Sequence, residues 1–133
     1  MNANLRRMAA RHGTPLFILD HGKIRENYRI FKRHLPRVQC YYAVKANSHP
    51  EIIKTLFHEG SSFDVASYNE FMQVYEYIQH FEEQEKDFFI WDKIIFSNTI
   101  KDRDTLRKIQ RYRPLVTFDN PAELKKITVT RPA

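Results

Sequence analysis

The stretch VQCYYAVKANSHPEIIKTLFHEGSSFDV, residues 38–65, decides the fold. Residues 38–44 are rich in aromatic and β-branched side chains, which predicts a strand. Pro50 suits the first turn of a helix, and Gly60 suits its end. Residues 62–65 predict the next strand. Strand, helix and strand in this order form a βαβ unit, in which the two strands run parallel.

The alternation of strands and helices continues on both sides of this unit. Apolar runs predict further strands at 16–19, 94–96 and 115–118. Helical spacing of apolar residues predicts helices at 1–12, 24–35, 102–111 and 121–127, and another that follows Ser67 and reaches Phe81. Ser67 with Glu70 three residues later fits a capping box. The pattern indicates a parallel sheet with helices outside it.

Strand spacing is compatible with two architectures. From residue 41 onward the strand centres fall near residues 41, 64, 95 and 117, at steps of 23, 31 and 22 residues. Such steps suit the βα units of a doubly wound sheet or of a (β/α)8 barrel. A barrel takes about 250 residues. The 133 residues of this chain would therefore hold about half of one.

The longest step contains an insertion at 79–93. Its acidic residues are expected to form a solvated helix end, and its Phe-Phe-Ile-Trp run, 88–91, either packs inward or forms a contact surface. Glu76, His80 and Glu83 could share one face of a continuous helix, as metal ligands sometimes do. An exposed charged face explains these three residues better, so no metal is expected.

Composition narrows the function classes. No apolar run approaches the ~20 residues that span a bilayer. The three glycines lie far apart, which excludes a Walker loop or a GxGxxG turn. The single cysteine, Cys40, excludes an internal disulfide and suits the reducing cytoplasm. A net charge of +6 leaves a basic nucleic-acid-binding module open, but the positive residues are spread along the chain.

Lys45 is the sharpest candidate for chemistry. Alternation places it with Tyr41 and Ala43 on one face of the predicted strand, at the carboxyl end where parallel α/β folds bind ligands. A lysine amine there can act as a nucleophile towards a carbonyl compound. Alone, such a lysine is more often an exposed ion-pair partner.

The order of several motifs gives Lys45 a context. GTPLFILD (13–20), YAVKANS (42–48), FDVAS (63–67), IIFSN (94–98) and TFD (117–119) follow one another along the chain. Together they resemble the N-terminal part of the fold-type III pyridoxal-phosphate decarboxylases, which act on ornithine, arginine, lysine or diaminopimelate. Alanine racemase is a more distant member. The resemblance implies a barrel of the alanine racemase and ornithine decarboxylase type, of which residues 1–133 hold about half.

The resemblance also implies a site. Lys45 would bind pyridoxal 5'-phosphate covalently, and Asp64 would be the electrostatic partner of its amine, so both are expected to be catalytic. Ala43 would lie beneath the cofactor ring. Glu70 would support the cofactor site, although its capping role competes on equal terms. Asn98, Lys101 and Asp119 match family positions near strand ends without an assigned role.

The resemblance leaves much of the enzyme outside these residues. The segment 16–19 would belong to a β-sandwich domain, and that domain and the second half-barrel would be absent. The implied activity is decarboxylation of a basic amino acid, ornithine first, by a cytoplasmic homodimer that binds neither nucleic acid nor membrane. The glycine-rich phosphate loop has no counterpart here, so this chain alone is expected to be inactive. The alternative is a non-catalytic cofactor-binding fragment or pseudoenzyme.

Overall fold

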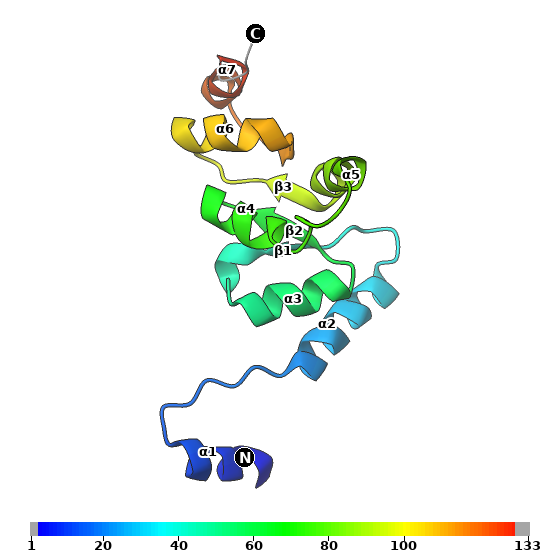
Figure 1. Ribbon diagram of the computed structural model, residues 1–133, viewed down its shortest axis with the longest axis vertical. Helices are drawn as coiled ribbons and strands as arrows, with labels where there is room; N and C mark the ends of the chain where they lie inside the picture. The colour runs from blue at the N-terminus through cyan, green and yellow to red at the C-terminus, as the bar shows by residue number, and fades with distance from the viewer. Residues whose placement is uncertain (1–2, 130–133) are drawn as a thin grey trace.

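A parallel four-stranded sheet forms the centre of the computed structural model, which describes residues 3–129 (Figure 1). Strands β1 (Tyr41–Ala43), β2 (Ser62–Val65), β3 (Ile94–Phe96) and β4 (Leu115–Val116) lie side by side in chain order. Every neighbouring pair is parallel. Each strand adds to the same edge without the reversal of a doubly wound sheet, so the strand order is that of half a barrel. The predicted parallel sheet is confirmed.

Helices alternate with these strands as expected. The helices are α1 (Ala3–His12), α2 (His21–His34), α3 (Pro50–His58), α4 (Tyr68–Tyr75), α5 (Glu83–Lys93), α6 (Arg103–Ile109) and α7 (Pro121–Val129), with 3-10 turns η1 (Val44–Ala46) and η2 (Gln110–Tyr112). Gly13 and Gly60 follow α1 and α3 with φ of 81° and 78°, a backbone region that favours glycine at helix ends. In the described part of the chain no helix is long and apolar enough to cross a bilayer.

The core lies between one face of the sheet and the helices that cover it. On that face Val44, Phe63, Val65, Ile94 and Phe96 are at most 1% exposed. Residues of α3, α4 and α6 complete the core, among them Ile53, Leu56, Phe71, Val74, Leu106 and Ile109. Strand alternation turns Tyr41, Ala43, Asp64 and Ile95 to the opposite face, where all four are partly exposed. In a complete barrel with this strand order, that second face would line the interior, and we call it the interior face.

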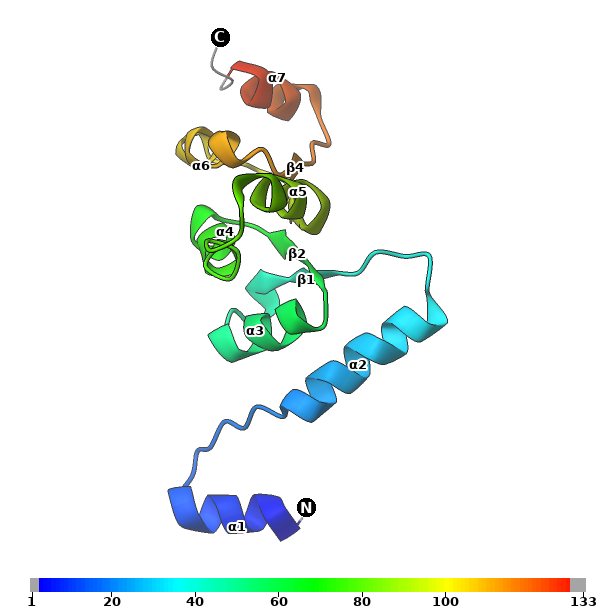
Figure 2. The same cartoon turned by 45° about the vertical axis from the view of Figure 1, so that its right-hand side comes forward.

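The predicted strand at 16–19 is wrong for this structure. Residues 16–20 have no regular structure, and Phe17 is 68% exposed. A strand needs a neighbour for its backbone hydrogen bonds, and β1–β4 form the only sheet within residues 3–129. Figure 2 shows α1, at the start of this segment, set apart from the other helices. The apolar residues Leu5 and Met8 on α1 are likewise exposed.

The insertion at 79–93 forms a helix of its own. The helix after Ser67 ends at Tyr75, and α5 begins at Glu83, where Glu82 and Glu85 form a capping box. Glu76, His80 and Glu83 therefore do not share one helix face, and within residues 3–129 no cluster of His, Cys, Asp and Glu suits a metal ion. Ile90 packs into the core, which confirms inward packing for this residue, while Phe88 and Trp91 are 67% and 59% exposed, so a contact surface there stays a prediction.

Candidate functional site

Lys45 lies directly after β1, at the carboxyl end of the sheet. It occupies the 3-10 turn η1 and not the strand itself, so it does not continue the alternation of Tyr41 and Ala43. Fully buried Val44 anchors the turn, and the Tyr42 hydroxyl donates to the carbonyl of Asn47 at 2.9 Å. The Lys45 side chain is exposed, and within residues 3–129 its amine has no hydrogen-bond or ion-pair partner. The turn therefore presents a free primary amine on a fixed backbone.

Ala43 and Asp64 are direct neighbours across β1 and β2. Their Cα atoms are register partners, so both side chains point to the interior face of the sheet. Asp64 accepts a hydrogen bond from the Ser97 hydroxyl at 2.5 Å, which fixes its carboxylate from the end of β3. Asp64 makes no ion pair with Lys45 in the described structure, so the expected charge partnership is not formed here.

Glu70 serves the loop that follows Asp64. The Ser67 hydroxyl accepts from the backbone N–H of Glu70 at 3.2 Å, so Ser67 is the expected N-cap of α4. The Glu70 carboxylate accepts from the backbone N–H of Ala66 at 2.8 Å, one residue before the N-cap. Glu70 thus stabilises the turn between β2 and α4, which agrees with its predicted role in capping α4.

Lys101 and Asn98 meet in the loop after β3. Lys101 is 1% exposed, its amine donates to the Asn98 carbonyl at 2.5 Å, and it lies 5.9 Å from the centre of the Phe96 ring. Burial lowers the pKa of the Lys101 amine. The backbone N–H of Lys101 donates to Glu123 of α7 at 3.3 Å. Through these contacts, Lys101 connects the loop after β3 to α7.

Contacts at both ends of the sheet were not predicted from the sequence. Ser97 follows the predicted strand 94–96 at the same sheet edge as Lys45, and that position was the signal that could have identified it. At the opposite end, the Tyr41 hydroxyl donates to the Asp92 carbonyl at 3.0 Å, and Gln39 donates to the same carbonyl at 2.6 Å. The end of α5 is thereby connected to the start of β1.

Asp119, which the resemblance also singled out, is exposed, and its carboxylate accepts a hydrogen bond from the Asn120 side chain at 2.7 Å.

Comparison with known proteins adds independent information. Residues 21–133 match the family described as pyridoxal-dependent decarboxylase, pyridoxal binding domain. The lysine/ornithine decarboxylase of Selenomonas ruminantium is 35% identical over 126 residues, which cover 94% of this chain and 30% of that protein. Antizyme inhibitor 2 of Homo sapiens is 32% identical over 118 residues, 88% of this chain and 24% of that protein.

A solved structure shows the same architecture. The lysine/ornithine decarboxylase from Vibrio vulnificus, complexed with cadaverine, superposes with a TM-score of 0.80 at 30% identity, over 97% of this chain and 34% of that one. The chain spans about a third or less of the length of these relatives. The matched range includes β1–β4, Lys45 and Asp64. The chain therefore belongs to the pyridoxal-dependent decarboxylase family and carries its N-terminal, pyridoxal-binding part.

Proposed function

We propose that this chain contributes the cofactor lysine of a pyridoxal-phosphate decarboxylase for a basic amino acid, ornithine first and lysine next. Arginine and diaminopimelate remain further candidates. The observation that carries the proposal is the free amine of Lys45 at the carboxyl end of β1, next to the paired residues Ala43 and Asp64. Carbonyl chemistry needs an accessible primary amine, and this turn provides one.

The residues present fit the aldehyde end of pyridoxal phosphate. Lys45 would hold it covalently, while the methyl side chain of Ala43 leaves room for a flat ring above the interior face of the sheet. The Asp64 carboxylate, oriented by Ser97, supplies negative charge on the same face. When bound, this cofactor supplies an electron sink for the pair left behind by departing carbon dioxide.

The chain's own residues have defined tasks in such a site. The Lys45 amine would form the covalent link to the aldehyde group of the cofactor. The Asp64 carboxylate would supply negative charge on the same side of the sheet. Glu70 acts as a positioning residue, because its bond to the Ala66 N–H holds the loop that follows Asp64. Other residues would orient the substrate and bind the phosphate group of the cofactor.

Cofactor binding and catalysis are separable in this proposal. The three glycines of the chain are dispersed, so no glycine-rich loop is available to hold the phosphate. We expect these 133 residues alone not to release carbon dioxide. Activity would need further sequence within a cytoplasmic homodimer.

A non-catalytic cofactor-binding protein is the second candidate. The observation in its favour is the 32% identity to an antizyme inhibitor, whose name does not describe a decarboxylase. This candidate shares the covalent link at Lys45 and differs only in the absence of carbon dioxide release.

Borohydride trapping separates these candidates. The protein is incubated with pyridoxal phosphate, reduced, digested and mapped by mass spectrometry, with ornithine, lysine, arginine and diaminopimelate offered in parallel. We expect a modified Lys45 in the wild type and none at that position in Lys45→Arg. Lys54→Arg, on the exposed side of α3, is the matched control and should leave the label unchanged. An unmodified Lys45 would contradict both candidates. A modified Lys45 in a full-length protein that releases no carbon dioxide from any of the four amino acids would support the second.

A further inference from the structure

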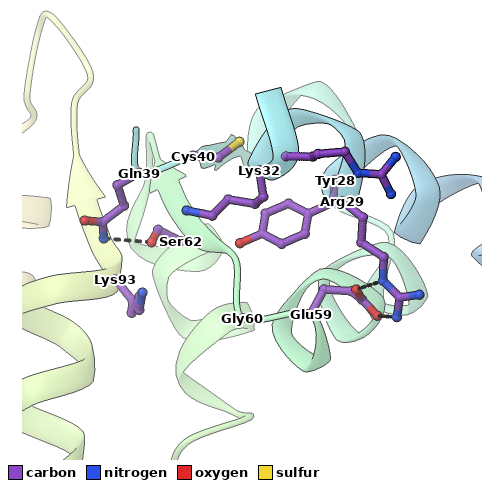
Figure 3. Close-up of a pocket in the computed structure, with 10 residues that line it drawn as sticks. Tyr28, Arg29, Lys32, Gln39, Cys40, Glu59, Gly60, Ser62 and Lys93 are labelled. Atoms are coloured by element: carbon purple, nitrogen blue, oxygen red, sulfur yellow. Dashed lines mark hydrogen bonds and ion pairs between the residues drawn. The ribbon is translucent and has the colours of Figure 1, made fainter. Parts of the chain in front are cut away.

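A pocket of about 590 Å³ lies at the opposite end of the sheet from Lys45 (Figure 3). It is bounded by α2, by the residues that lead into β1 and β2, and by Lys93 at the end of α5. Pockets of this size accommodate small metabolites. Because Lys45 follows the carboxyl end of β1 and this pocket adjoins the amino ends of the strands, the two sites are distinct.

The charges around the pocket are unbalanced. Its lining includes the cations Arg29, Lys32, Arg33 and Lys93, and Glu59 is its only acid. Glu59 is already satisfied, since Arg29 donates two hydrogen bonds to it at 2.6 and 2.8 Å and Arg25 lies 3.7 Å away. The Lys93 amine lies 3.3 Å from the carboxylate of Asp92, just outside the lining, whereas Lys32 and Arg33 have no ion pair within residues 3–129.

Hydrogen-bond donors converge in this space. The Lys32 amine uses one N–H on the Val38 carbonyl at 3.2 Å and keeps two. Figure 3 shows the Lys32 amine and the Tyr28 hydroxyl both extending towards the side of the pocket formed by Ser62. Burial raises the pKa of Tyr28, so its hydroxyl stays a donor at neutral pH. Cys40 is also held neutral because burial raises the pKa of its thiol.

We propose that this pocket binds a phosphate monoester of small-metabolite size, with its phosphate between Lys32, Tyr28 and Lys93. A phosphate dianion offers several strong acceptor oxygens, which matches a pocket rich in cationic and neutral donors. The pocket volume exceeds that of a phosphate group, so the organic part of the ligand occupies the remainder. Free inorganic phosphate shares the recognising chemistry and serves as the reference ligand. The proposal does not depend on any cofactor at Lys45.

Calorimetric titration at constant ionic strength tests the site. Inorganic phosphate, ribose 5-phosphate and neutral ribose are titrated into the protein with chloride as the only other anion. We expect both phosphates to bind with a Kd of about 1 mM or tighter, ribose 5-phosphate more tightly, and ribose not at all. Equal affinity of the two phosphates would show that the site recognises the phosphate group alone and would overturn the metabolite assignment.

Variants locate the binding. Lys32→Gln and Lys93→Gln should each weaken ribose 5-phosphate binding at least tenfold. Lys23→Gln is the matched control on the same helix, where Lys23 pairs with Glu26 at 2.8 Å, and should leave the affinity unchanged. Lys45→Ala should also bind normally. Binding that survives both Lys32→Gln and Lys93→Gln, or that is lost in Lys45→Ala, would overturn the proposal.

Discussion

The Ser97 hydroxyl donates a 2.5 Å hydrogen bond to the Asp64 carboxylate, across the gap between the ends of β3 and β2. The two residues lie 33 positions apart in the chain. Asp64 is a register partner of Ala43 on one side and of Ile95 on the other, so the bond fixes a carboxylate in the middle of the interior face. Ser97 thereby connects a third strand to the proposed cofactor site.

Removing the Ser97 hydroxyl should therefore affect both stability and the site. For Ser97→Ala we expect a loss of about 1.5–3 kcal/mol in the free energy of unfolding, as for a hydrogen bond to a charged acceptor. The freed Asp64 should also reduce the extent of borohydride labelling at Lys45. Urea denaturation and peptide mapping measure the two effects. Ser97→Thr keeps the hydroxyl and is the control; equal behaviour of Ala and Thr variants would show that the bond has no role.

A larger residue at position 43 should block the cofactor without unfolding the chain. Ala43 is partly exposed on the interior face, so Ala43→Leu adds bulk outside the packed core, directly beside Asp64. We expect at least tenfold weaker binding of pyridoxal phosphate in an absorbance titration. Ala46→Leu, in the exposed part of η1, is the matched control and should bind normally. Undiminished binding by Ala43→Leu would place the cofactor ring elsewhere.

The order of elements was predictable because each depends on local pattern. Helical spacing of apolar residues and boundary residues such as Pro50 and Gly60 predicted α3 correctly. Strand lengths were less predictable, since residues 38–44 have strand-forming side chains but only Tyr41–Ala43 find partners on β2. The segment 16–19 fails for the same reason: a strand-like sequence forms a strand only beside another one.

Breaks in helices and contacts across the chain were the hardest to foresee. The helix after Ser67 was expected to reach Phe81, yet it ends at Tyr75. Ile78 is nevertheless fully buried. The apolar pattern therefore predicted which residues are buried, but not where the helix ends. Lys45 and Asp64 could be placed at strand ends from the sequence. The hydrogen bond between Asp64 and Ser97, and the lack of a bond between Asp64 and Lys45, could not be predicted. Such contacts depend on side-chain rotamers and on neighbours from distant strands.

The ion pair between Arg29 and Glu59 predicts a pH-dependent contribution to stability. The hydrogen bonds from Arg29 hold the pKa of Glu59 below its ordinary value of 4.5. A depressed carboxyl pKa stabilises the fold above the unfolded-state pKa, and this contribution is lost as the pH falls through the folded-state value. Arg29→Met should therefore lower the Tm slightly at pH 7 and have no such effect in strong acid. Thermal melts of both proteins at several pH values measure this.

The control for that series is Arg33→Met on the same helix. Arg33 has no ion pair within residues 3–129, so its removal should give a Tm difference that does not vary between pH 3 and pH 7. A Tm difference for Arg29→Met that persists unchanged in acid would mean that Arg29 stabilises the fold through packing of its aliphatic stem.

Lys101 also predicts that stability rises with pH, but in the alkaline range. Burial holds the pKa of its amine below the ordinary value of 10.5, so between the two values the unfolded chain binds more protons than the folded one. Stability then rises with pH in this interval, by at most about 1.4 kcal/mol per pH unit for one proton. Lys101→Met has no proton to release. The wild type should gain stability relative to this variant as the pH rises towards 10.5.

Urea denaturation of both proteins at intervals from neutral pH to about pH 10 measures this gain. Comparing the two proteins cancels the tyrosines, including Tyr28 and Tyr42, whose pKa values are raised by burial and which favour unfolding at high pH. Lys125→Met, exposed on α7, is the matched control and should differ from the wild type by a constant amount. If the Lys101→Met difference is equally constant, the amine is hydrated in solution, and the contact with α7 rests on the backbone of Lys101, which bonds to Glu123 and Lys126.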